Sequence, residues 1–309
     1  LVAWLPRYAP AARRMAPLLN LRDRLPGAPA LSERLLGFSA RRSLPAWRRD
    51  SFTATPNGVA VERDGRDVVL LVDTFNRYFE PENARSAMRL LDAAGYRVHG
   101  ADPASGRPLC CGRTFLAGGL IDEARAEARR TLEALRPFVE AGVPVVGLEP
   151  SCLLTLRDEF KALLPGKASD LLATRALLLS EFLSAEQQAG RLALELSPLP
   201  YTRALVHGHC HEKAFGAMAS VIAMLKLVPG LEVEAIESSC CGMAGAFGYE
   251  AEHIDVSMRM AEISLLPAVR GAGPDVAIVA DGTSCRHQIK DGAAREAVHA
   301  VRLLEQALA

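Results

Sequence analysis

Seven cysteines are the side chains of this 309-residue sequence best suited to chemistry. Four lie in the last third of the chain, where Cys210, the adjacent pair Cys240 and Cys241, and Cys285 each follow an apolar run typical of a strand. Four thiolates at neighbouring strand ends can surround one metal ion or cluster. Adjacent cysteines rarely bind one zinc ion together but can contact different irons of a cluster. The pattern therefore favours an iron-sulfur cluster, 4Fe-4S, with a zinc or iron ion as the alternative.

A second, smaller set of thiols precedes this one. The Cys110-Cys111 pair lies 130 residues before the later pair, and Cys152 follows the next predicted strand. The position that would match the first cysteine of the later set, near Thr74, has no thiol. Three thiolates can hold a metal with an external ligand or a carboxylate such as Asp73. The sequence leaves two interpretations open, a second metal site or a decayed copy of the first.

Histidine and basic residues cluster around the later thiols. In an extended His207–His211 segment, alternation would place the three histidines on one side and Cys210 on the other. We predict that His209 is a further metal ligand, since imidazole nitrogen binds both zinc and iron. Five other residues are candidates for hydrogen bonding to the ligands or for contact with a substrate: His207, His211, Lys213, Arg286 and His287.

The elements that must position these side chains alternate between strand and helix. Strands are predicted at 68–72, 96–99, 143–148, 204–207, 231–236 and 276–280. Helices are predicted at 84–94, 120–141, 211–227, 249–266 and 293–308, with turns around the cysteines. This order predicts an α/β protein of two duplicated β-α-β-α-β-α units with largely parallel sheets. Loops at the carboxyl ends of parallel strands are where such folds place their chemistry.

A basic segment precedes the two repeats. The first fifty residues carry ten arginines and three acidic residues, a net charge of +7, and their prolines allow only short helices. We predict a basic helical arm or linker at 1–55, a first cysteine-rich repeat at 56–200 and a second at 201–309. The arm and the initial Leu1 are expected of a segment of a larger protein.

Composition excludes several classes of protein. The formal net charge is zero and half of the residues are hydrophobic, which argues against a nucleic-acid binder and against a disordered chain. No apolar run is long enough to span a membrane. An odd number of cysteines in a long chain without a signal peptide favours metal or redox chemistry over disulfides. We expect a cytoplasmic protein, or one bound peripherally at the inner face of a membrane.

The motifs resemble a known family. Cys110-Cys111-Gly112 and Cys240-Cys241-Gly242 resemble the twice-repeated cysteine-rich CCG domain that occurs in the glycolate oxidase iron-sulfur subunit and in heterodisulfide reductase. Segments 149–152, 207–211 and 284–288 are most similar to the C-terminal part of multidomain FAD-linked 2-hydroxy-acid dehydrogenases of the D-lactate or D-2-hydroxyglutarate type.

This resemblance implies an electron-transfer module that is not catalytically complete alone. It would receive electrons from FAD on an upstream domain or partner, work beside a ferredoxin-type iron-sulfur domain, and pass electrons toward a quinone or another acceptor.

The sequence departs from the family at two positions. In each repeat the first cysteine of the expected C-x2-C motif is replaced, by Glu149 in one and by Gly282 in the other. A five-cysteine, noncubane cluster is therefore not assumed.

Two other functions stay open. One is a structural zinc module that docks catalytic domains, and the other is a substrate-contacting domain that uses His209, His211 or Arg286.

Overall fold

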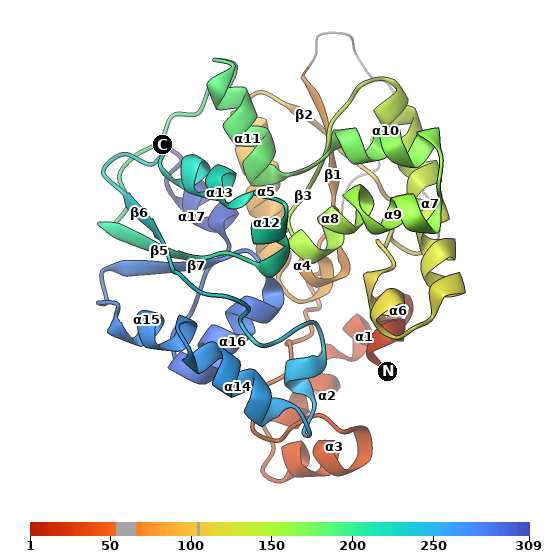
Figure 1. Cartoon of the computed structure of the whole chain (residues 1–309), viewed down its shortest axis with the longest axis vertical. Coiled ribbons are helices and arrows are strands. Elements are labelled where there is room, and N and C mark those ends of the chain that lie inside the picture. The colour runs from red at the N-terminus through yellow and green to blue at the C-terminus, as the bar shows by residue number, and fades with distance from the viewer. Residues whose placement is uncertain (54–65, 104–105) are drawn as a thin grey trace.

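Two parallel β-sheets form the frame of the protein in a computed structural model that describes residues 1–53, 66–103 and 106–309 (Figure 1). The first has the order β2-β1-β3-β4 and the second the order β6-β5-β7. Every strand pair is parallel, which confirms the predicted fold class. The strands are β1 (Asp67–Leu71), β2 (Arg97–Gly100), β3 (Val145–Gly147), β4 (Ala176–Leu178), β5 (Arg203–His207), β6 (Glu232–Ala235) and β7 (Val276–Ala280).

The two sheets share one topology, because the first strand of each is central and the next two strands flank it. The central strand β1 is buried along its whole length, as its unbroken apolar run predicts for a strand covered on both faces. Strand β4 has no counterpart in the second sheet and was not predicted. The predicted boundary between residues 55 and 56 lies outside the described residues.

Helices follow the strands and cover the sheets. The first half contains α4 (Thr74–Tyr78), α5 (Pro81–Ala93), α6 (Arg113–Ala117), α7 (Ile121–Glu140), α8 (Pro150–Arg157), α9 (Glu159–Leu163), α10 (Lys167–Arg175) and α11 (Leu179–Gln188). The second half contains α12 (Cys210–Ala214), α13 (Met218–Leu225), α14 (Ile254–Glu262), α15 (Leu265–Gly271), α16 (Thr283–Ala293) and α17 (Ala300–Gln306).

Three predicted helices of the second half were wrong in extent. The helix predicted at 211–227 is interrupted at Gly216, whose φ of +69° lies outside the helical region. The helix predicted at 249–266 begins five residues later and is divided into α14 and α15. The segment predicted as a turn before residue 293 is helix α16, while the helix predicted at 293–308 begins only at Ala300. Cys285 therefore lies in the first turn of a helix.

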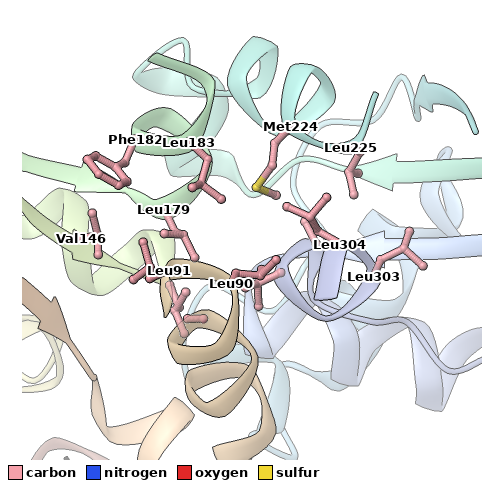
Figure 2. Close-up of a cluster of buried hydrophobic side chains, with 14 of the residues drawn as sticks. Leu90, Leu91, Val146, Leu179, Phe182, Leu183, Met224, Leu225, Leu303 and Leu304 are labelled. Carbon is pink, nitrogen blue, oxygen red and sulfur yellow. The ribbon is translucent and has the colours of Figure 1, made fainter. Parts of the chain in front are cut away.

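The halves are joined by a continuous apolar core. Helices α5 and α11 of the first half pack against α13 and α17 of the second (Figure 2). The buried contacts come from leucine, methionine and phenylalanine side chains that include Leu90, Leu183, Met224 and Leu304. Because this core fixes one sheet against the other, the carboxyl ends of the two sheets have a defined relative position.

The basic arm is helical, as predicted, and contains α1 (Leu5–Ala12), α2 (Ala16–Leu19) and α3 (Ala28–Leu36). It contacts both halves. Trp4 packs edge-on against Phe115, and the Ser39 amide donates to the carbonyl oxygen of Tyr249 at 2.8 Å. Several of the arm's arginines pair with acidic residues of this same chain, for example Arg41 with Asp255. Among the described helices, none is both long and apolar enough to cross a membrane.

Candidate metal centre

Three parallel strands deliver the later cysteines to one edge of the second sheet. Cys210 is the first residue of α12, which follows β5. Cys240 and Cys241 lie in the loop after β6, and Cys285 lies in the first turn of α16, after β7. The predicted convergence of these loops follows from the parallel pairing of the strands.

The four thiols form a row in which Cys240 hydrogen-bonds to Cys210 and Cys241, and Cys241 lies beside Cys285. Hydrogen bonding from Cys210 and Cys241 lowers the pKa of Cys240, and the same contacts raise the pKa values of the two donors. At the other end of the row the Sγ atoms of Cys241 and Cys285 are 3.3 Å apart, and this contact lowers the pKa of Cys285. Thiols with a lowered pKa are in the thiolate form, which is the form that binds metal.

The Cys-Cys-Gly turn directs backbone N–H groups at sulfur. Gly242 has a φ of +88°, and its amide donates to Cys240 Sγ at 3.3 Å. A Cβ at this position would lie 2.2 Å from the carbonyl oxygen of Ser257, so only glycine fits. The first repeat has the same turn, with Gly112 at a φ of +80° and its amide 3.3 Å from Cys110 Sγ. The shared turn supports the duplication that the 130-residue spacing predicts.

One buried group at this edge brings three ligand atoms within 4.8 Å of one another: His207, Cys241 and Cys285. The only other such group among the described residues, Glu250, Glu252 and His253, is partly exposed. The four thiols do not form such a compact set. His207 Nδ1 is 2.8 Å from Ser238 Oγ, and its Nε2 is buried with no hydrogen-bond partner among the described residues.

His209, the predicted histidine ligand, caps helix α12. Its Nδ1 accepts a hydrogen bond from the His211 amide at 3.1 Å, and burial lowers its pKa. The ring also fills the space of the missing C-x2-C cysteine. A Cβ at Gly282 would lie 2.5 Å from His209 Cδ2 and 3.3 Å from both His209 Nε2 and Cys285 Sγ. The segment is not extended throughout, because α12 begins at Cys210.

The remaining basic candidates have other partners. Lys213 donates to the carbonyl oxygens of Ser238 and Ser239, and so holds the loop that precedes the cysteine pair. The buried guanidinium of Arg286 pairs with Glu80, with 2.8 Å between Nε and Oε1. It therefore connects the halves and does not point to a substrate.

The two other histidine candidates lie at different depths. His287 is half-buried and lies edge-on to Tyr249, and desolvation lowers its pKa. His211 lines the cavity described below, and burial followed by the neighbouring His209 lowers its pKa to about 4. It is neutral at physiological pH.

The first set of thiols has no compact group of ligand atoms like that of His207, Cys241 and Cys285. Cys110, Cys111 and Cys152 are buried, and they form no group of ligand atoms within 4.8 Å of one another. A hydrogen bond with Cys111 lowers the pKa of Cys152. Burial and the neighbouring Asp73 and Glu149 carboxylates act in the opposite direction and outweigh it, so the pKa is raised to about 11. The Asp73 carboxylate accepts from the amides of α4 and from the Asn76 side chain, so it is a helix cap and not a free ligand.

Glu149 is a functional candidate that was not predicted as a site residue. From the sequence it was only a departure from the family pattern. Its carboxylate accepts from Ser151 Oγ at 3.0 Å and from the Thr283 amide at 3.0 Å, across the boundary between the halves. Burial and the nearby Asp73 charge raise its pKa to about 8. Its place in the missing C-x2-C motif was the one sequence signal that could have identified it.

All seven cysteines line a single cavity of about 870 Å³. Its walls are largely apolar and include arm residues such as Leu5, Leu31 and Trp47. A volume of this size suits an organic molecule. Neither the shared cavity nor the arm's place in its wall was predictable from the sequence, because both depend on how distant segments pack.

A parallel α/β fold with thiols at its strand ends defines a class of cysteine-rich protein with a potential metal site. Comparison with known proteins places the chain within that class. Residues 204–290 match the model of the CCG cysteine-rich domain. The resemblance predicted from the Cys-Cys-Gly motifs is confirmed.

Sequence relatives are dehydrogenase components. The chain is 29% identical over 297 residues to a subunit of the anaerobic glycerol-3-phosphate dehydrogenase of Escherichia coli K12, covering 95% of this chain and 73% of the relative. It is 26% identical over 302 residues to the D-2-hydroxyglutarate dehydrogenase of the same strain, covering 94% and 28%. The Pseudomonas putida D-2-hydroxyglutarate dehydrogenase is 30% identical over 247 residues, covering 78% and 22%. The chain therefore spans about a quarter of the length of these two D-2-hydroxyglutarate dehydrogenases.

Proposed function

We propose that this chain is an iron-sulfur electron-transfer module of a dehydrogenase that oxidises a CH–OH group. Electrons would come from a flavin domain or subunit and leave toward a quinone or another acceptor. The dehydrogenase relatives support the reaction class, since glycerol 3-phosphate and 2-hydroxyglutarate both contain a CH–OH group. A bound cluster would supply one-electron storage, and the chain would supply thiolates and a buried surrounding.

The observation that carries the proposal is the row of four thiols from Cys210 to Cys285. A tetrahedral zinc site needs all ligand sulfurs about 2.3 Å from one ion. The described thiols do not gather within 4.8 Å of one another, yet each contacts the next. An elongated row with a backbone N–H donor at Cys240 suits a cluster of several irons better than a single ion.

The matched cysteine pairs provide the test. Anaerobic reconstitution with ferrous iron and sulfide should give the unaltered chain iron, acid-labile sulfide and visible absorption. Cys241→Ser should lose most of the iron, whereas Cys111→Ser, the equivalent position 130 residues earlier, should keep it. Stoichiometric zinc without iron or sulfide would contradict the proposal and favour the structural zinc module. Equal iron loss in both variants would show that the first set of thiols also binds metal.

The cavity supports an apolar acceptor such as a quinone. The cavity is lined both by the thiols and by apolar side chains of the arm. Most large apolar side chains that are exposed among the described residues also belong to the arm, including Leu18, Leu31 and Leu35. Apolar side chains beside arginines are typical of a surface that lies on an anionic membrane, from which a quinone would enter.

Vesicle flotation tests the membrane contact. The chain should float with vesicles that contain anionic lipid and remain unbound with neutral ones. Leu31→Ser combined with Leu35→Ser should reduce binding by about tenfold or more, since two leucine side chains that enter lipid contribute a few kcal/mol and each 1.4 kcal/mol is tenfold. Ile263→Ser, at an exposed apolar side chain outside the arm, is the control and should bind normally. Unchanged flotation of the double variant would contradict this assignment.

A further inference from the structure

Two histidines lie beside the later thiols, and their hydrogen bonds give them different ring protonation. A neutral imidazole has one N–H and one lone pair, so the partner of one nitrogen fixes the role of the other. A metal can bind only the nitrogen that carries the lone pair. Metal-binding histidines usually donate their other N–H to an oxygen atom nearby.

His207 has the arrangement of a ligand. The Ser238 hydroxyl donates its single hydrogen to the carbonyl oxygen of Ile236, at 3.3 Å, and accepts from Lys213 Nζ at 3.3 Å. Its remaining lone pair faces His207 Nδ1 at 2.8 Å, and from this arrangement we infer that Nδ1 carries the hydrogen. The lone pair is then on Nε2, which is buried. His207 belongs to the buried group whose ligand atoms lie within 4.8 Å, with Cys241 and Cys285.

His209 has the opposite arrangement. Its Nδ1 accepts from the His211 amide at 3.1 Å, so the hydrogen of the neutral ring is on Nε2. That atom and Cys285 Sγ both lie 3.3 Å from the point that a Cβ at Gly282 would occupy. The Nε2–H group therefore faces the sulfur side of the site as a donor.

We propose that His207 binds the metal through Nε2 together with Cys241 and Cys285, and that His209 donates a hydrogen bond to the centre instead of binding it. The inference rests on the proposed function in that it concerns the same centre. It reverses the roles that the sequence predicted for the two histidines. It also supplies a nitrogen ligand to a site in which Gly282 has replaced a cysteine.

X-ray absorption of the whole chain loaded with Zn²⁺ alone tests the proposal. The unaltered chain should show an imidazole nitrogen at about 2.0–2.1 Å besides sulfur at about 2.3 Å. His207→Cys should lose the nitrogen and gain sulfur, whereas His209→Gln should keep the nitrogen. An all-sulfur site in the unaltered chain, no zinc binding, or loss of the nitrogen in His209→Gln alone would overturn the proposal.

A variant outside the ligand set guards against misfolding of the His207 variant. Ser238→Ala removes the acceptor of His207 Nδ1, together with the hydroxyl's contacts to Lys213 and Ile236, and leaves all proposed ligands in place. It should weaken zinc affinity by about 10- to 100-fold while the nitrogen signal persists. Unchanged affinity would contradict the role given to Nδ1.

The iron and sulfide assay tests the proposed function separately. Zinc bound through His207 without cluster assembly would contradict the proposed function and leave this inference standing.

Discussion

At the scale of single residues, the later cysteines differ in ionisation because they hydrogen-bond to one another. Cys240 accepts from two neighbouring thiols and from the Gly242 amide, and these contacts lower its pKa. The pKa of Cys285 is lowered by Cys241. The first set has raised pKa values instead. Since a thiolate is the metal-binding form, chemistry at this scale favours the later set.

Alkylation of Cys240 in the metal-free protein should report this difference. Because its pKa is lowered, the rate with iodoacetamide should change little between pH 6 and 8. An ordinary thiol loses roughly 100-fold of its thiolate over that interval as pH falls. Cys210→Ala removes the main hydrogen bond, so labelling should become slower at pH 6 than at pH 8. Mass spectrometry of the labelled peptide gives the rate, and a pH-independent rate in the variant would contradict the assignment.

At the scale of elements, the Cys-Cys-Gly turn determines where the thiols point. Its glycine has a left-handed backbone and packs against the carbonyl oxygen of Ser257 in α14. The turn is thereby seated on the helix that follows it. A side chain at this position would displace the loop that carries Cys240 and Cys241.

Gly242→Ala should destabilise the chain by about 3 kcal/mol or more and lower its iron content, because the added methyl group meets backbone. Gly245→Ala is the matched control in the same loop. Its φ of +69° is also left-handed, but its Cβ position has no atom within 4 Å. The control should cost only about 1 kcal/mol. Urea unfolding measures both, and equal costs would show that the contact with Ser257 is unimportant.

At the scale of the whole molecule, the halves are joined by polar contacts as well as by the apolar core. Arg286 of α16 pairs with Glu80, which precedes α5 in the first half. Burial alone would raise the pKa of Glu80, but the Arg286 guanidinium lowers it to about 2. The pair therefore contributes to the free energy of unfolding only while the carboxylate is ionised.

Stability should fall with acid through this pair. The unfolded carboxyl group titrates near its ordinary value of 4.5, so the contribution is complete above about pH 5 and is lost as pH falls toward 2. The full difference amounts to about 3 kcal/mol. Glu80→Gln should be less stable than the unaltered chain at pH 6, with the difference shrinking toward pH 3. Glu82→Gln, which breaks a more exposed pair with Arg48, should cost less than about 1 kcal/mol. Urea unfolding across this pH range gives the free energy of unfolding of both variants. A loss in Glu80→Gln that does not shrink toward pH 3 would contradict the role given to this pair.

Much of the site was predictable because its chemistry follows local patterns. The cysteine spacing, the apolar strands and the glycine of each Cys-Cys-Gly turn predicted two repeats with thiols at strand ends. Parallel strands bring such ends together whatever the details of packing. The same local patterns misplaced the start of α16, because a helix that begins directly after a strand leaves no separate turn signal.

The sequence by itself determined the fold class, the duplication and the set of thiols, because residue type and short-range spacing encode these. Only the tertiary structure decided which histidine faces the thiols with a lone pair, since Ser238 lies 31 residues from His207. It also decided that Arg286 binds Glu80 and that the arm forms a wall of the cavity. Such contacts join segments far apart in the chain, and they depend on how the two sheets pack against their shared core.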